Sequence, residues 1–119
     1  PETAELLAIR LRSHKFEVHI EPLGSKALQH AQLNPPDLVI LDLKLPDMSG
    51  HQVCQQLQEI NQPWGIPILM LTDLNHPIDE LRSFAYGANA YLAKPYDPEE
   101  LLRTIGYLFG EASSSKEAA

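Results

Sequence analysis

The chain contains one cysteine in 119 residues, so it cannot form an internal disulfide. That residue, Cys54, stands beside Val53 and Leu57 in a helical pattern, which favours a small packing residue over a nucleophile. No run of 18 apolar residues and no signal-peptide pattern occurs, which argues against a membrane span and favours a cytoplasmic location. At this length one domain can bury a core without disulfides or a structural metal.

Basic residues are scarce as well. Nine Lys and Arg stand against 16 Asp and Glu, and the net charge of −7 leaves no basic footprint, so we expect no direct nucleic-acid binding by this segment. A glycine-rich phosphate loop, a Ser/His/Asp order and a Cys/His pair are also missing, which weighs against a small α/β enzyme of another kind. The five histidines show no metal-binding spacing, and they are interpreted as solvated side chains.

The most informative segment is present at residues 38–43, where five of six residues are aliphatic. The run is too short for a membrane span and too continuous for a half-exposed strand, so it predicts a buried strand of a parallel sheet. Asp42 stands at the carboxyl end of this strand, just before a turn between Pro46 and Gly50. A carboxylate there occupies the usual ligand position of an open α/β sheet, although a strand-end Asp can also simply cap a turn.

Helical and strand-like patterns alternate along the chain, beginning with a helix at Pro1. They predict five helices and four strands, the strands at 16–21, 38–43, 67–72 and 90–93. This alternation indicates an α/β fold with a doubly wound parallel sheet and right-handed crossovers. Residues 1–110 form the predicted domain, and the serine-rich residues 111–119 are expected to be a linker or a disordered tail.

Three polar residues stand at the carboxyl ends of three different predicted strands: Asp42, Thr72 and Lys94. In a parallel sheet these ends share one edge, so the side chains can converge although they are far apart in sequence. A carboxylate can act as a nucleophile toward phosphorus, while a hydroxyl and an ammonium can hold phosphoryl oxygens. Each residue alone could have a local role; the combination at equivalent positions favours phosphoryl chemistry.

The sequence resembles a response-regulator receiver domain of two-component signalling. The resemblance is carried by the segments Pro36–Gly50, Pro67–Thr72, Gly87–Tyr96 and Pro98–Leu101, in that order and spacing. It implies a flavodoxin-like fold with strand order 2-1-3-4-5, and a signalling module rather than an enzyme, although self-dephosphorylation is possible.

The resemblance also implies roles for individual residues. Asp42 would be the phosphoacceptor, charged by a histidine kinase or a phosphotransfer protein, and Thr72 and Lys94 would bind the phosphoryl group. Tyr91 matches the aromatic switch position, whose ring moves inward when Thr72 shifts. The Lys94–Pro95 bond matches one that is usually cis. Mg²⁺ would be bound by Asp42 and by the backbone carbonyl of Lys44.

Two departures from the family pattern stand out. Pro1 matches the residue just after the acidic pair that ends the first strand, so that strand and the two remaining Mg²⁺ ligands are missing from this chain. We expect weak metal binding and a longer native protein, a degenerate receiver or a swapped strand being alternatives. The acidic Asp73 follows Thr72 where the family usually has a small residue, so altered phosphorylation or dephosphorylation rates are expected.

The interpretation favoured by the sequence is therefore a phosphorylatable receiver, with a non-phosphorylated pseudo-receiver that binds protein partners as the alternative. The face made by the 77–86 helix, the Tyr91 strand and the last helix is the family's usual output surface. We expect a homodimer there, if the chain dimerises, and no membrane partner.

Overall fold

The computed structural model describes residues 4–62, 65–73 and 76–118, with side chains up to Phe109; Pro1 lies outside this range. Eight elements follow one another along these residues. They are α1 (Ala4–Ser13), α2 (Gly24–Leu33), β1 (Val39–Leu41), α3 (Gly50–Ile60), β2 (Ile68–Thr72), α4 (Pro77–Ala85), β3 (Ala90–Ala93) and α5 (Pro98–Ala118). No helix in the described part of the chain is long and apolar enough to cross a membrane, and a cytoplasmic location stays a prediction.

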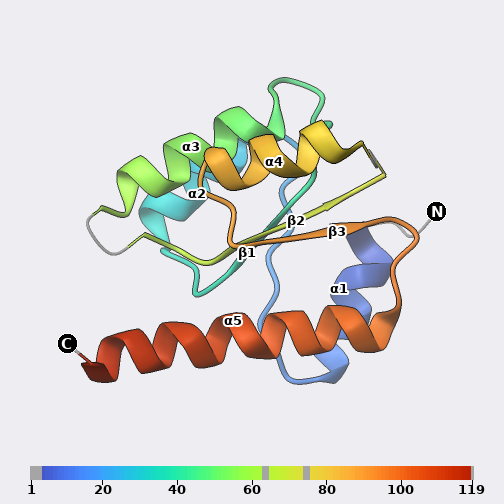
Figure 1. Ribbon diagram of the computed structural model, residues 1–119, viewed down its shortest axis with the longest axis vertical. Helices are drawn as coiled ribbons and strands as arrows, with labels where there is room; N and C mark the ends of the chain where they lie inside the picture. Colours follow the sequence, from blue (N-terminus) through green and yellow to red (C-terminus); the bar gives the residue numbers. More distant parts are fainter. Residues whose placement is uncertain (1–3, 63–64, 74–75, 119) are drawn as a thin grey trace.

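The three strands form one parallel sheet in the order β1-β2-β3. β2 is central, and all five of its residues are buried, as its continuous apolar run predicts. Helices cover both faces: α2, α3 and α4 on one side and α1 and α5 on the other (Figure 1). The predicted α/β class and the predicted strands near 38–43, 67–72 and 90–93 are confirmed.

The core divides into two clusters because successive side chains of β2 point to opposite faces. Ile68 and Met70 pack in the cluster that contains residues of α2 and α3. Leu69, between them in sequence, belongs to the cluster that contains Leu11 of α1 and residues of α5. The central strand therefore joins two helical layers, and its last residue, Thr72, is buried where the strand ends.

The prediction of a strand at residues 16–21 is wrong, and the described sheet has three strands rather than four. An alternating segment becomes a strand only where a neighbouring strand takes its backbone hydrogen bonds, and no described strand pairs with this one. The alternation still reports burial correctly. Phe16 and Val18 pack against the cluster of α1 and α5, and the ring of Phe16 stacks on Phe109 at 5.6 Å between centroids.

The last helix extends beyond residue 110, where the sequence predicted that the domain ends. α5 runs to Ala118, so residues 111–118, for which a linker or a disordered tail was predicted, continue the helix. The division of the chain into a domain at 1–110 and a tail at 111–119 stays a prediction.

Candidate functional site

The carboxyl edge of the sheet brings together the three residues that the sequence singled out. Asp42 directly follows β1, Thr72 is the last residue of β2, and Lys94 directly follows β3. The Nζ of Lys94 donates to Oδ2 of Asp42 at 3.2 Å, and the backbone N–H of Lys94 donates to the carbonyl of Thr72 at 2.7 Å. Hydrogen bonds from Lys94 thus connect a carboxylate, an ammonium and a hydroxyl-bearing residue at this edge.

The turn after β1 positions the Asp42 carboxylate. Its Oδ1 accepts the backbone N–H of Lys44 at 3.1 Å, and the N–H of Gly50 donates to the carbonyl of Leu43 at 2.9 Å. A Cβ at Gly50 would collide with the backbone carbonyl of Asp42, so glycine is required for this close approach. Because both carboxylate oxygens accept hydrogen bonds, the side chain is held in one orientation.

Exposure differs within this group. The side chains of Asp42 and Lys94 are 32% and 27% exposed, whereas Thr72 is completely buried. A reagent in solution can therefore reach the carboxylate and the ammonium, while the threonine is enclosed by the core. The neighbouring Asp73 is exposed, so solvent reduces the effect of its charge on this group.

Tyr91 lies in β3, opposite Met70 of β2, and packs against the core cluster of α2 and α3. The pKa of Tyr91 is raised, first by burial and then by the negative charges of Asp79, Glu80 and Asp42. Asp79 and Glu80 belong to the first turn of α4, so the negative charges that act on this tyrosine come from that helix as well as from Asp42. The Lys94–Pro95 peptide bond is cis, as the resemblance implied.

The oxygen ligands expected for Mg²⁺ are the Asp42 carboxylate and the Lys44 carbonyl. Mg²⁺ requires near-octahedral oxygen coordination, of which water can supply several ligands. Among the described residues, Asp42 belongs to no group of three or more His, Cys, Asp or Glu side chains close enough to share a metal ion. One carboxylate, already bonded to an ammonium, and one carbonyl do not by themselves fit a magnesium site.

Sequence reasoning missed the role of Asp47, which it treated only as part of the turn. Its Oδ1 accepts the backbone N–H of Gly24 at 2.8 Å, and its Oδ2 accepts that of Ser25 at 3.1 Å. Hydrogen bonds from Ser25 and Gly24 hold the pKa of Asp47 below its usual value. The carboxylate therefore caps α2 and ties the turn that carries Asp42 to that helix. A weak sequence signal existed, because the first turn of α2 contains no acid of its own.

Comparison with known proteins gives a consistent result. The family model of the response regulator receiver domain matches residues 1–106. The DNA-binding dual master transcriptional regulator RpaA of Synechocystis sp. is 36% identical over 119 residues, which is 100% of this chain and 49% of that protein. The DNA-binding response regulator MtrA of Mycolicibacterium smegmatis is 39% identical over 105 residues, 88% of this chain and 45% of that protein.

A solved structure agrees in fold and in sequence. The BeF3-activated N-terminal receiver domain of Klebsiella pneumoniae RstA superimposes with a TM-score of 0.81 at 33% identity, covering 87% of this chain and 86% of that one. The chain spans about half the length of the two curated relatives, whose DNA-binding activity belongs to the whole proteins.

Proposed function

The chain belongs to the response regulator receiver domain family, and we propose that within it Asp42 accepts a phosphoryl group from a histidine kinase or a phosphotransfer protein. Receiver domains are signalling modules of two-component response regulators rather than classical enzymes, and such regulators interact with partners of these two kinds. The observation that carries the proposal is the pair formed by Asp42 and Lys94 at 3.2 Å, beside the buried Thr72.

The geometry suits attack by the carboxylate on phosphorus. One oxygen of Asp42 forms the new P–O bond while the P–N bond of a phosphohistidine breaks, and the donor imidazole leaves with the electron pair and takes up a proton. The product carries more negative charge than the carboxylate it replaces. Lys94 already bonds to Asp42, so its ammonium is in place to bond a phosphoryl oxygen without a large rearrangement.

Signal transmission would begin at Thr72. A phosphoryl oxygen, which is absent in the resting state, would offer Thr72 a state-dependent contact, and only such a contact can shift a conformational equilibrium. Tyr91 lies in β3, the strand that pairs with β2, and would follow a movement of Thr72. The change would thus reach the surface formed by α4, β3 and α5.

Two of these elements, α4 and α5, carry exposed apolar side chains. Ile78, Leu81 and Phe84 of α4 are 44%, 66% and 45% exposed, and Tyr107 of α5 is 67% exposed. These side chains of α4 are therefore substantially exposed to solvent instead of being fully packed on the sheet. These residues support a protein contact, and a homodimer controlled by phosphorylation is the proposed use of the face.

Receiver domains generally use Mg²⁺ for phosphorylation. The donor set of Asp42 and Lys44 supports only weak binding of this ion by the present chain. The pairing of Asp42 with Lys94 in reach of solvent favours a phosphoacceptor over a pseudo-receiver. The pseudo-receiver alternative is therefore not proposed as a second function.

The test is phosphoryl uptake from phosphoramidate with an excess of Mg²⁺, measured by intact mass. Wild type should gain one phosphoryl group, and Asp42→Asn should gain none. Asp37→Asn serves as the matched control, because it removes an exposed acid of the same segment and should leave uptake unchanged. Equal uptake by wild type and Asp42→Asn would refute the assignment of the phosphoacceptor.

A further inference from the structure

We propose that His19, Glu21 and His30 form a binding site for a divalent transition metal ion of the zinc class. The proposal is independent of phosphorylation at Asp42, because none of these residues belongs to the carboxyl edge of the sheet. His19 and Glu21 lie in the extended segment at 16–21, and His30 lies in α2. The fold, not the sequence spacing, brings the three ligands together.

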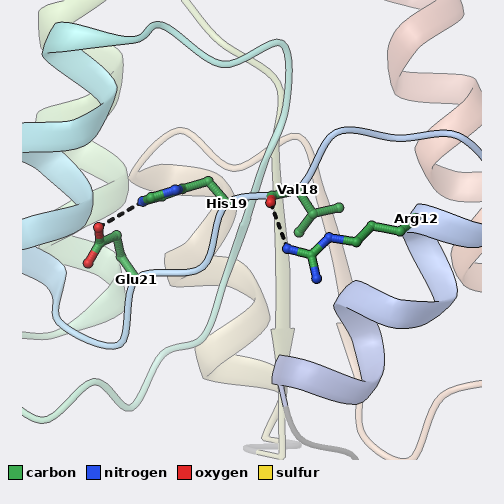
Figure 2. Close-up of polar contacts among 4 residues, drawn as sticks. All are labelled: Arg12, Val18, His19 and Glu21. Atoms are coloured by element: carbon green, nitrogen blue, oxygen red, sulfur yellow. Dashed lines mark hydrogen bonds and ion pairs between the residues drawn. The ribbon is translucent and has the colours of Figure 1, made fainter.

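The contacts within the cluster are close. The Nε2 of His19 lies 2.8 Å from Oε2 of Glu21. The ring of His19 stacks on that of His30 with 3.6 Å between centroids and 4° between planes. Figure 2 shows the imidazole of His19 directed toward Glu21, on the side of the segment away from Arg12. The guanidinium of Arg12, which donates to the carbonyl of Val18 at 3.0 Å, therefore adds no positive charge between the ligands.

The spacing of the donor atoms suits a metal ion. One ligand atom from each residue lies within 4.8 Å of the others, and this is the one such group in the described part of the chain. Three atoms at that spacing share a central point about 2.8 Å or less from each, whereas zinc bonds to His and Glu measure about 2.0–2.2 Å. Because a metal–imidazole bond lies in the plane of the ring and the two rings are stacked 4° from parallel, one ring must also rotate out of the stack, through a rotamer change at this partly exposed site, to complete the coordination.

The chemistry of the ligands selects the class of ion. Two imidazoles and one carboxylate are typical of zinc and of other borderline divalent metals, and they are poorly suited to Mg²⁺ or Ca²⁺, which prefer oxygen ligands only. Water can supply a fourth ligand, because the side chain of His19 is 52% exposed. Without a cation the cluster is held by the contact between His19 and Glu21 and by the stacking of the two rings; a cation would replace that contact with bonds from the same donors to the metal.

A bound metal would fasten the 16–21 segment to α2. No described strand pairs with this segment, and its backbone is held from the other side by the bond from Arg12 to Val18. A link between His19, Glu21 and His30 would restrain it from the α2 side. Zinc should therefore raise the unfolding temperature of the chain, since an ion that binds only the folded state stabilises it.

The experiment is a calorimetric titration of zinc chloride into the chain with an excess of Mg²⁺, so that oxygen ligands such as Asp42 do not contribute. One zinc ion per chain is expected for wild type. His19→Ala, His30→Ala and Glu21→Gln should each lower the affinity at least about tenfold. Co²⁺ should give the visible absorption of a four-coordinate site in wild type and lose it in the three variants.

The matched control is His14→Ala, which removes an exposed histidine whose ring contacts Ser13 and Arg10 at the end of α1. It should bind zinc as wild type does. Glu21→Gln preserves shape, and its unfolding temperature without metal should equal that of wild type, which separates loss of a ligand from loss of folding. The proposal is overturned if wild type takes up no zinc or if the three variants keep wild-type affinity for zinc. It is also overturned if His14→Ala loses as much zinc affinity as the three variants do.

Discussion

The pair formed by Lys94 and Asp42 allows a quantitative test of what the carboxyl edge is for. At 3.2 Å the direct attraction between the two charges ranges from about 1.3 kcal/mol in a water-like medium to about 5 kcal/mol at an effective dielectric of 20. Both side chains are about a third exposed, at 27% and 32%, and measured pairs of this kind contribute only about 0.2–1 kcal/mol. Lys94→Ala should therefore lower the free energy of unfolding by no more than about 1 kcal/mol.

The effect of the same substitution on phosphorylation should be much larger. A charge-assisted hydrogen bond to a phosphoryl oxygen is worth about 1.5–3 kcal/mol, so its loss should slow uptake by roughly ten- to a hundredfold. The measurements are urea unfolding and the rate of phosphoryl uptake from phosphoramidate, followed by intact mass. The mismatch between a small stability effect and a large kinetic effect is the signature of a functional lysine.

Lys44→Ala is the matched control. It removes the neighbouring exposed lysine side chain but keeps the backbone groups of Lys44 and the pair between Asp42 and Lys94. Both its stability and its uptake rate should stay near wild type. A loss of more than about 3 kcal/mol in Lys94→Ala, with uptake unchanged, would mean that the pair is structural and that the reasoning from exposure is mistaken.

Three further predictions follow from individual residues. Thr72→Ala and Tyr91→Ala should each accept phosphate at Asp42 but lose the phosphorylation-dependent change in dimerisation, measured by sedimentation; a wild-type response in both would exclude the proposed coupling. The pKa of Asp47 is lowered from 3.8 in the folded state, so its capping of α2 stabilises the fold above that pH and is lost as the pH falls through the lowered value. Asp47→Asn should therefore flatten the dependence of unfolding free energy on pH in this acidic range, and an unchanged profile would contradict it. Burial raises the pKa of Cys54 to about 11, so a disulfide reagent at neutral pH should modify it only after unfolding, and rapid reaction with the native chain would be the contrary result.

The strand-forming segments were predictable because burial leaves a direct trace in sequence. Residues 38–43 and 67–72 are nearly continuous in apolar side chains, and such runs are stable only when both faces of a strand are covered. A polar residue at or just before the end of each run, Asp42 or Thr72, marks the edge of the sheet. The segment at 16–21 shows where this reasoning stops: its alternation reports which side chains are buried, but pairing depends on a neighbouring strand.

Helix capping and side-chain clusters were harder to predict. The cap of α2 comes from Asp47, 23 residues beyond Gly24, and no local pattern connects the two. The histidines at 19 and 30 have no metal-binding spacing in sequence, because an extended segment and the following helix bring them together only after the chain turns back at Pro22 and Leu23. Contacts of this kind depend on how elements pack, not on residue order.

The sequence by itself determined the α/β class, the parallel strands around Asp42, Thr72 and Lys94, and the sheet edge at which they end. Hydrophobic periodicity and the geometry of parallel strands are local properties that each segment carries with it. Only the tertiary structure decided that Lys94 donates a hydrogen bond to Asp42 and that Thr72 is buried while these two side chains reach solvent. The stacking of His19 on His30 was likewise decided by the tertiary structure. Those features arise from packing two helical layers on one sheet, because distances between side chains of different elements are set by the core and are not encoded in any single segment.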